Sequence, residues 1–439
     1  MTAEDLIDEL RDGACFPGEP ADVELIQTHL SVVCVAGDRV YKLKKAVTLP
    51  FVDFAPLPAR RRACRDEVRL NRRLCPDTYL GTAALRRRGG ALRFAEVGDD
   101  EGREDLDVAV VMRRLPQERM LDELVRRRAV AADDMVALAR LVARFHDGAD
   151  RGPEVLAHGD PGKLAEFAAA NFAELREVPD HGVAEPLLAA LERHSAADFE
   201  RVLPELRRRA TAGRVVDGHG DLHARNVCMT DPPTVYDCIE FEPSFRCGDV
   251  ATEVAFLAMD LRYRGATPLA EAFVDAYVEA SGDERLCALL PTLCAYRAMV
   301  RAKVAALAAA ETELPADDRE GARGSARRHV LLASAYAIEQ DGPTWLCFAG
   351  PPASGKSTLA RALADEVRWP HVRTDVVRKE LAVLDQDARA GDEHYTTAFS
   401  ARTYAEVQRR AAAHTAAGAG CVMLDGNHPT PRHRADAAA

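Results

Sequence analysis

The sequence predicts a protein of α/β and α+β class, in which an antiparallel sheet and a helical region precede a separate parallel sheet. Three observations predict this arrangement. Short β-rich runs occupy residues 23–43, and Gly37-Asp38 between two of them is a hairpin turn signal. Residues 121–206 have mostly helical spacing. The apolar run from Thr344 to Ala349 continues into a glycine-containing loop and a helical pattern, which is typical of a phosphate-binding unit.

Composition limits the kinds of protein this chain can be. The 439 residues are enough for about three domain-sized units, or for one two-lobed domain plus another. A net charge of -12 argues against nucleic acid or an anionic membrane as the main partner. The 11 cysteines are an odd number without a Cys-x-x-Cys pair, which indicates reduced thiols. Because no signal peptide or long apolar run is evident, we expect a cytoplasmic protein without a membrane span.

The N-terminal third predicts a small sheet with one helix. Strands are expected at 23–27, 31–36, 39–43, 81–85, 91–96 and 108–112, and a helix at 59–74. Lys42 and Lys44 are two apart on the third strand and therefore lie on the same face. Geometry alone does not choose between them, and a solvated basic edge strand would also explain both. Residues 112–116 then read as a hinge.

Helical patterns dominate from residue 121 to the linker at residues 340–343. They continue over 249–280 and 285–310, beyond the central motif described next. Arginine triplets recur in this region and before it, without interleaved aromatic residues, so we interpret them as solvated faces and do not expect nucleic-acid binding.

The stretch from His219 to Asp249 carries the clearest chemistry. It reads His219-Gly220-Asp221-Leu222-His223-Ala224-Arg225-Asn226, followed by Asp237-Cys238-Ile239-Glu240 and by Gly248-Asp249. Phosphoryl transfer needs a carboxylate that accepts the proton of the attacking hydroxyl, and an amide and a second carboxylate that hold magnesium against the phosphates. Asp221, Asn226 and Asp237 have the types and spacing for those roles. Each alone would be an ordinary turn or cap residue.

This pattern resembles the aminoglycoside phosphotransferase-like branch of the kinase fold. The resemblance implies a two-lobed protein-kinase-like fold over residues 1–340, with a small lobe at 1–115 and a large helical lobe at 116–340. It also implies ATP and Mg2+ as cofactors and a small molecule as the phosphate acceptor. Asp221 would be the catalytic base, and Asn226 and Asp237 would be the metal ligands.

The same resemblance assigns the upstream residues. A strand lysine would contact ATP, and we favour Lys42 over Lys44 because the family usually places this lysine after apolar residues at the middle of the strand. Glu67 on the helix would orient the lysine. The loop Thr28-His29-Leu30 would lie over the phosphates without a glycine-rich sequence, and the hydroxyls of Thr28 and Ser31 would substitute for backbone amides there. His223 and Glu240 would lie on the acceptor side, and Glu240 could also join the metal site.

A second phosphate-binding motif begins at Gly350. The sequence Gly350-Pro351-Pro352-Ala353-Ser354-Gly355-Lys356-Ser357-Thr358 is Gly-x4-Gly-Lys-Ser between a strand and a helix. Backbone amides of such a loop and Gly350, Ser354, Gly355 and Thr358 within it hold phosphates, while Lys356 reaches the outer ones and Ser357 ligates magnesium. A doubly wound parallel sheet should follow, with ligands at the carboxyl ends of its strands.

This C-terminal unit, residues 344–439, resembles small P-loop kinases similar to gluconate kinase and zeta toxin. By that resemblance Asp375 is a second base candidate, Arg378 a substrate contact and Asp425 a metal-water ligand. Judged by usual domain sizes, roughly a third or more of the unit is missing, so we expect a partial domain that binds nucleotide.

The whole chain resembles a bacterial two-domain arrangement usually described as a predicted kinase or ATPase. Our leading hypothesis is an ATP- and Mg2+-dependent transferase acting on a hydroxyl of a sugar, an amino sugar or an aminoglycoside-like molecule, with Asp221 as base and the P-loop as a second ATP site. Two alternatives stay open. The chain could be a nucleotide-binding regulatory protein, or a P-loop ATPase or kinase whose N-terminal kinase-like domain is non-catalytic. The sequence does not indicate the oligomeric state.

Overall fold

The computed structural model describes residues 6–427, apart from residues 29, 50, 51, 312, 313, 341, 352, 386, 387, 389 and 390. Contacts divide the chain into two compact units. The first consists of Met1–Ala165 and Val202–Ala288, and the second of Glu166–Arg201 and Leu289–Ala439. The domain boundaries expected from the sequence differ from this division and stay a prediction. His29 of the expected phosphate loop and residues 428–439 lie outside the described residues.

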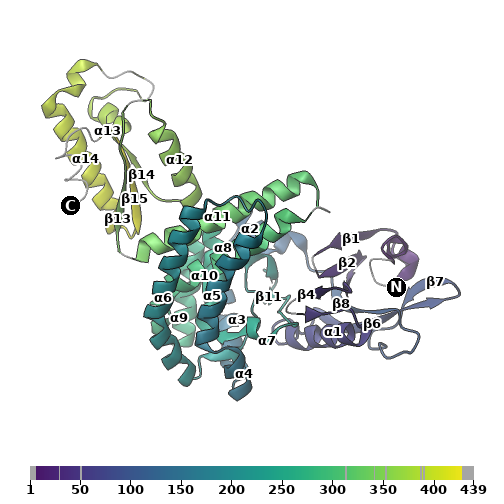
Figure 1. The fold of residues 1–439 in the computed structure, drawn as a ribbon. Coiled ribbons are helices and arrows are strands. Elements are labelled where there is room, and N and C mark those ends of the chain that lie inside the picture. Colours follow the sequence, from purple (N-terminus) through teal and green to yellow (C-terminus); the bar gives the residue numbers. More distant parts are fainter. Residues whose placement is uncertain are drawn as a thin grey trace. The chain divides into compact units, whose positions relative to one another are not determined.

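The first unit contains a six-stranded antiparallel sheet with the order β1-β2-β3-β8-β6-β7 (Figure 1). Its strands are β1 (Val23–Gln27), β2 (Ser31–Ala36), β3 (Arg39–Lys44), β6 (Tyr79–Arg88), β7 (Ala91–Phe94) and β8 (Asp107–Arg113). A short pair, β4 (Thr48–Leu49) and β5 (Val52–Asp53), follows β3. The expected antiparallel sheet is therefore confirmed, and β6 is longer than its apolar pattern indicated.

Alternation along β3 sends its residues to two different cores. Tyr41 and Leu43 are buried on one face, where the Tyr41 ring lies 5.0 Å from that of Phe16 and 4.6 Å from that of Phe94. The opposite face of the sheet packs against α1 (Leu57–Asn71), through α1 residues such as Cys64 and Val68. Because side chains alternate, Lys42 and Lys44 point to the α1 side, where Glu67 lies.

The helices and short strands of the first unit follow the sheet. They are α2 (Leu121–Arg126), α3 (Ala132–Gly148), α4 (Pro153–His158), α7 (Pro243–Arg246), α8 (Val250–Tyr263) and α9 (Thr267–Ser281), with β9 (Val215–Asp217) paired to β12 (Cys247–Asp249) and β10 (Val227–Cys228) paired to β11 (Thr234–Val235). The helical pattern over 249–280 is two helices. Gly265 has φ 77° and ends α8, a conformation that glycine adopts without strain. The Asp249 carboxylate caps α8 by accepting from Ala251 N at 2.9 Å.

Two long helices belong partly to each unit, α5 (Pro161–Glu177) and α6 (Glu185–Thr211). The second unit also holds α10 (Leu290–Ala310) and α11 (Ala316–Gln340). No helix in the described part of the chain has the length and apolar character needed to cross a membrane.

The rest of the second unit is a three-stranded parallel sheet with the order β13-β15-β14, covered by helices on both faces (Figure 1). Its elements are β13 (Thr344–Phe348), α12 (Lys356–Val367), β14 (His371–Arg373), α13 (Thr374–Leu381), α14 (Thr397–Ala416) and β15 (Cys421–Asp425). Ala360 and Val367 of α12 pack with Cys421 and Met423, whereas Val377 and Val407 pack with Val422 on the opposite face. The predicted fold class is confirmed.

Candidate active site

Lys42, Lys44 and Glu67 form the centre of a buried ion-pair cluster in the first unit. Glu67 is fully buried and accepts from both lysines, from Lys42 Nζ at 2.9 Å on Oε1 and from Lys44 Nζ at 2.5 Å on Oε2. Lys42 Nζ also donates to Asp237 Oδ1 at 2.6 Å, and Lys44 Nζ donates to Glu240. The predicted lysine–glutamate contact is therefore present twice. It does not by itself choose between the lysines.

Burial separates the two lysines. The side chain of Lys44 is 2% exposed and that of Lys42 is 15% exposed, while its partner Asp237 is 42% exposed. Lys42 therefore lies between a buried carboxylate and one that solvent or a ligand can reach. Lys44 is enclosed by Glu67 and Glu240, so its charge is neutralised entirely within the protein.

The charges in this cluster shift one another's pKa. Burial opposes the charged form of Lys42, but Asp237, Glu67 and Glu240 outweigh it and hold its pKa well above the ordinary value. Burial likewise opposes the charged forms of Glu67 and Asp237, and the lysines outweigh it, so both pKa values are lowered. For Glu240 burial dominates and its pKa is raised. Lys42 is thus a cation at neutral pH, suited to bind an anionic group.

The loop from Gly218 to Asn226 lies between β9 and β10, and α8 holds it through two acids. Glu253 accepts from the backbone N–H of His219 and, at 2.8 Å, from that of Gly220. Asp260 Oδ2 accepts from Ala224 N at 2.9 Å. Both acids were missed by sequence reasoning. The signal for them is that they are the acidic residues of an otherwise mostly apolar α8.

Glycine is required where this loop passes closest to its neighbours. A Cβ on Gly218 would lie 2.1 Å from Glu253 Oε1. Gly220 has φ 85°, and a Cβ there would lie 2.8 Å from Phe245 O. The close approach lets Glu253 bond two successive amides, which fixes the backbone just before Asp221.

Asp221 and Asn226 are bonded to each other across the loop. Asn226 Nδ2 donates to Asp221 O and to Asp221 Oδ2, both at 3.0 Å. His223 Nε2 lies 3.3 Å from the same Oδ2, and the His223 ring packs edge-on against Phe256. The Asp221 side chain is 31% exposed. Its carboxylate is therefore oriented by two side chains and still open to solvent.

Asp237 is tied to the same loop through its neighbours. It has φ 64°, an uncommon conformation for a residue other than glycine. Its backbone N–H donates to the Tyr79 hydroxyl at 3.2 Å, and Tyr236 N donates to Asn226 O at 3.0 Å. His219 Nε2 lies 3.0 Å from Tyr236 O. Of the remaining predicted contacts to ATP, Ser31 is buried at the start of β2, opposite Lys44.

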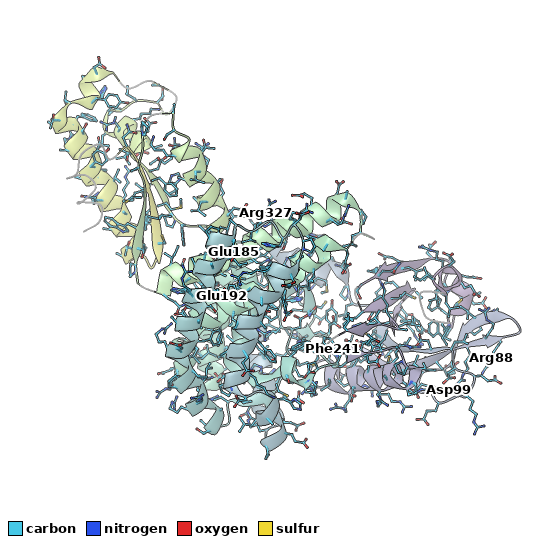
Figure 2. The ribbon with its side chains drawn as sticks, in the orientation of Figure 1. Arg88, Asp99, Glu185, Glu192, Phe241 and Arg327 are labelled. Carbon is cyan, nitrogen blue, oxygen red and sulfur yellow. The ribbon has the colours of Figure 1, made fainter. Side chains whose placement is uncertain are left out.

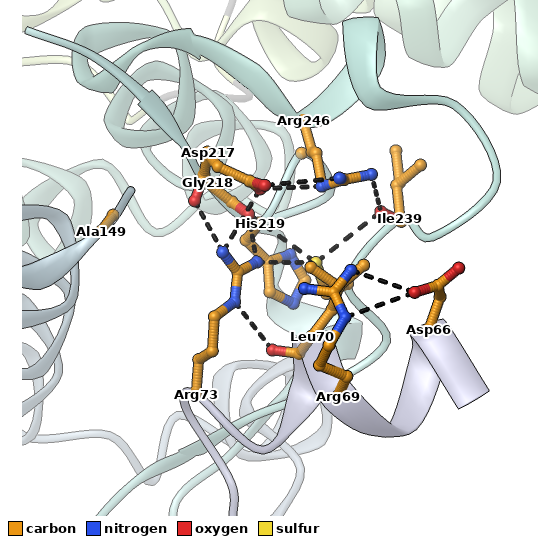
Figure 3. A network of polar contacts seen from close by, with 12 residues as sticks. Asp66, Arg69, Leu70, Arg73, Ala149, Asp217, Gly218, His219, Ile239 and Arg246 are labelled. Carbon is orange, nitrogen blue, oxygen red and sulfur yellow. Dashed lines mark hydrogen bonds and ion pairs between the residues drawn. The ribbon is translucent and has the colours of Figure 1, made fainter. Parts of the chain in front are cut away.

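An arginine after α1 joins this helix to the start of the loop, as Figure 3 shows. Arg73 donates to Asp217 O at 2.8 Å and to Gly218 O at 2.7 Å. Arg246 Nε donates to Asp217 Oδ1 at 2.7 Å. The helix that carries Glu67 and the loop that carries Asp221 are therefore fastened together. Nothing in the spacing of Arg73 distinguished it from the other arginines of its helix.

The second predicted site lies at the carboxyl end of β13. Gly355 has φ 82°, and α12 begins at Lys356, whose Nζ lies 3.3 Å from Pro351 O. Gly350 and Ser354 are close, since a Cβ on Gly350 would lie 3.1 Å from Ser354 Oγ. Ser357 is partly exposed and Thr358 exposed.

The other residues predicted for this site have different surroundings. Asp375 is half exposed and pairs with Lys379 at 3.0 Å. Asp425 is buried at the end of β15, with Oδ2 3.7 Å from His371 Nε2. Arg378 is also buried, where it donates to His394 O and lies 4.6 Å from the centre of the Tyr395 ring. Its guanidinium therefore has partners within the unit.

A buried lysine–glutamate pair next to a loop that carries Asp221 and Asn226 is typical of a kinase-type phosphotransferase. The family model for the phosphotransferase enzyme family matches residues 38–290, and a model for an AAA domain matches residues 346–439. The chain belongs to the phosphotransferase enzyme family, and it is a kinase of that family fused to a P-loop unit.

A curated relative matches nearly all of this chain and most of its own length. The uncharacterized protein Rv2004c of Mycobacterium tuberculosis is 33% identical over 433 residues, which are 97% of this chain and 82% of the relative. Among solved structures, a choline/ethanolamine kinase family protein from Mesorhizobium loti is 12% identical with a TM-score of 0.45, over 83% of this chain and 99% of that one. A choline kinase from Cryptosporidium parvum is 12% identical with a TM-score of 0.43, over 77% and 97%.

Proposed function

We propose that the chain is an ATP- and Mg2+-dependent phosphotransferase that phosphorylates a hydroxyl of a small molecule, with Asp221 as the base. The acceptor class we infer is a sugar, an amino sugar or an aminoglycoside-like molecule. The observation that carries the proposal is the hydrogen-bonded set that links Lys42, Glu67 and Asp237 on one side to Asn226 and Asp221 on the other. Eleven free thiols agree with a cytoplasmic location, where ATP is available.

Lys42 is the residue proposed to contact the phosphates of ATP. Its ammonium is held by Glu67 from behind, and its other partner, Asp237, is reachable from outside. An oriented cation in a partly enclosed site stabilises the negative charge of the transferring phosphoryl group. Ser31 and Lys44 would support this side of the site from β2 and β3.

Asp237 and Asn226 fit a magnesium ion. Magnesium prefers oxygen ligands, and a carboxylate with an amide oxygen leaves room for water and phosphate oxygens. Because Nδ2 of Asn226 bonds to Asp221, the amide group can offer Oδ1 to a cation. The bound ion would neutralise charge on the phosphates. Glu240, which pairs with Lys44, is proposed to support this site.

Asp221 would accept the proton of the acceptor hydroxyl. The amide of Asn226 and the imidazole of His223 orient its Oδ2, and the carboxylate remains accessible. A hydroxyl seated against this carboxylate becomes a better nucleophile as its proton leaves for Asp221. His223 would also contact the acceptor, because its Nε2 lies 3.3 Å from the carboxylate of the base.

The test is turnover of ATP with magnesium over a panel of sugars, amino sugars and aminoglycosides. We expect Asp221→Asn to lower kcat by about 10²-fold to 10⁴-fold while ATP still binds, since only the proton acceptor is lost. Asp133→Asn, an exposed acid in the first turn of α3, is the matched control and should keep full activity. Unchanged turnover in Asp221→Asn would refute the assignment of the base.

The P-loop unit supports a second proposed function, nucleotide binding around Lys356. The observation in its favour is the left-handed Gly355 at the junction of loop and helix, which directs backbone amides and the α12 N-terminus toward one place. Ser357 would hold magnesium there and Asp425 its water, with Asp375 as the base and Arg378 as the substrate contact. A regulatory role for this nucleotide is the alternative to catalysis.

A further inference from the structure

A cavity of about 460 Å³ lies in the first unit, lined by residues that have no part in the proposed phosphotransfer site. It is bounded by α3, by the C-terminal end of α9, and by residues just before β9 and at the start of α8. Its volume is within the range of small-molecule sites, about 300–1,000 Å³. Nothing in the proposed transfer of phosphate uses it.

Four arginines line this cavity: Arg140, Arg144, Arg151 and Arg214. A single lining carboxylate, Asp147, faces them. This concentration of positive charge occurs in a chain whose net charge is -12. Arg140 and Arg144 are four residues apart on α3, so they share a face and repel each other. In the described part of the chain, neither has an acidic partner.

The two other arginines are held in place by the protein. Arg151 donates to the carbonyls of His146, Asp147, Ala149 and Gly213 at 2.7–2.9 Å. Arg214 lies 3.7 Å from Asp283, but that carboxylate already accepts two bonds from Arg209. The charge on Arg151 is thus fixed at the cavity wall by neutral groups, which is a pre-organised arrangement for an anion.

The dipoles of α3 and α9 offer another reason for cations here, because both helices end at the cavity. A helix C-terminus favours a cation by about 0.3–1 kcal/mol. That explains Arg151, which bonds to carbonyls at the end of α3. It does not explain Arg140, two turns before the end of the helix, or the hollow between the arginines.

We propose that this cavity is a binding site for a phosphorylated small molecule, whose anionic group is held by Arg140, Arg144 and Arg151. Its floor includes two buried residues, His146 and Tyr277. The floor connects to the loop of Asp221, since the Tyr277 hydroxyl lies 2.8 Å from His146 Nδ1 and His146 Nε2 lies 2.9 Å from Glu253 Oε2. Glu253 bonds the loop amides of His219 and Gly220.

Because the floor of the cavity is bonded through Glu253 to the loop of Asp221, the site has a regulatory role. This role rests on the proposed function. A ligand that packs on Tyr277 and His146 orders the groups that hold Glu253, and Glu253 fixes the backbone before the base. Binding of the anion should therefore raise the rate of phosphotransfer. Tyr277 and His146 are positioning residues in this scheme.

The binding part is tested by calorimetry on the full chain, with inorganic phosphate, pyrophosphate and glucose 6-phosphate as probes and with excess ADP and magnesium present to fill the nucleotide sites. We expect at least one probe to bind, and Arg140→Gln/Arg144→Gln to weaken it by about tenfold or more. Arg88→Gln, which removes a charge from the exposed end of β6 (Figure 2), is the control and should bind normally. Equal affinity in the double variant, or no binding of any probe below about 1 mM, overturns the site.

Two further variants separate this proposal from the proposed function. Asp221→Asn should bind the probe as the wild type does, so the cavity stands even if phosphotransfer fails. If instead Lys42→Met abolishes probe binding, the anion occupies the ATP site and the proposal is overturned. Tyr277→Phe should bind the probe within about twofold, yet lose the rise in kcat that the probe causes in the wild type. A rise that persists in Tyr277→Phe refutes the coupling.

Discussion

The two lysines of β3 share one glutamate but differ in what else they touch. Glu67 gives one carboxylate oxygen to each. Lys44 also donates to Glu240, whose side chain is 5% exposed, whereas Lys42 donates to the accessible Asp237. The spacing of the lysines left the choice between them open, and the family resemblance favoured Lys42. Their second partners agree with the proposal that Lys42 contacts the ligand, while Lys44 pairs with buried carboxylates.

Replacing each lysine by methionine should separate these roles. Lys44→Met leaves Glu240 and one oxygen of Glu67 buried without a cation, so the free energy of unfolding should fall by about 3–5 kcal/mol. Lys42→Met leaves Glu67 paired with Lys44 and should cost less stability, but it should lower kcat/KM by about 10²-fold or more. Urea unfolding followed by circular dichroism and turnover assays measure the two effects. The double variant Lys44→Met/Glu240→Gln should recover part of the lost stability, and the opposite pattern would assign the ligand to Lys44.

At the scale of elements, the loop from Gly218 to Asn226 depends on α8 for its shape. Two acids on this mostly buried helix, Glu253 and Asp260, accept backbone N–H groups at both ends of the loop. Burial opposes the charge on Glu253, but the bonds from His146 and the loop outweigh it and lower its pKa to about 2. These bonds hold the loop against α8 and thereby fix the position of Asp221.

Substitution by alanine is expected to have opposite effects at two glycines in and near this loop. At Gly220 φ is 85° and a Cβ would lie 2.8–2.9 Å from Phe245 O and from the backbone of Arg246, so Gly220→Ala must move the loop. We expect a loss of stability of about 1–3 kcal/mol and a fall in kcat of about 10²-fold. Gly248 has no atom within 4 Å of a Cβ and no positive φ, so Gly248→Ala should behave as the wild type. Thermal melting and turnover of both variants check this. If Gly220→Ala keeps wild-type stability and turnover, the close contact at Gly220 does not fix the position of Asp221.

For the whole molecule, the sequence predicted what depends on local patterns. Alternating runs gave the strands around Lys42, and the strand–loop–helix pattern gave β13 and α12. Motif spacing selected Asp221, Asn226 and Asp237. Asn226 bonds to Asp221, Asp237 bonds to Lys42, and the backbone N–H of Tyr236, next to Asp237, donates to Asn226 O. These features depend on short segments of the chain, so the local sequence is enough to predict them.

Contacts between distant segments were not predictable in this way. Arg73 and Asp217 are 144 residues apart, and Lys44 and Glu240 are 196 apart. Each has an ordinary residue type, and only the folded chain brings it next to its partner. The cavity next to His146 is of the same kind, because its arginines come from separate segments that the fold gathers.

The complete chain is expected to bind two molecules of ATP, one at each predicted site. Asp237 belongs to the first unit and Lys356 to the second, and the predicted ligands of each site lie within one unit. Calorimetry with a non-hydrolysable ATP analogue and magnesium should therefore give about two sites per chain for the wild type and one for either Asp237→Ala or Lys356→Ala. The first change removes a proposed ligand of the magnesium ion that holds the phosphates, and the second removes the cation that the P-loop phosphates need. Arg88→Gln is the control for a general loss of positive charge. If Lys356→Ala keeps two sites, or if both variants lose the same one, the P-loop unit does not bind nucleotide independently. If Asp221 is the base, phosphate is transferred at the site in the first unit. Asp237→Ala should then lose turnover, whereas Lys356→Ala should transfer phosphate to the small-molecule acceptor at the wild-type rate.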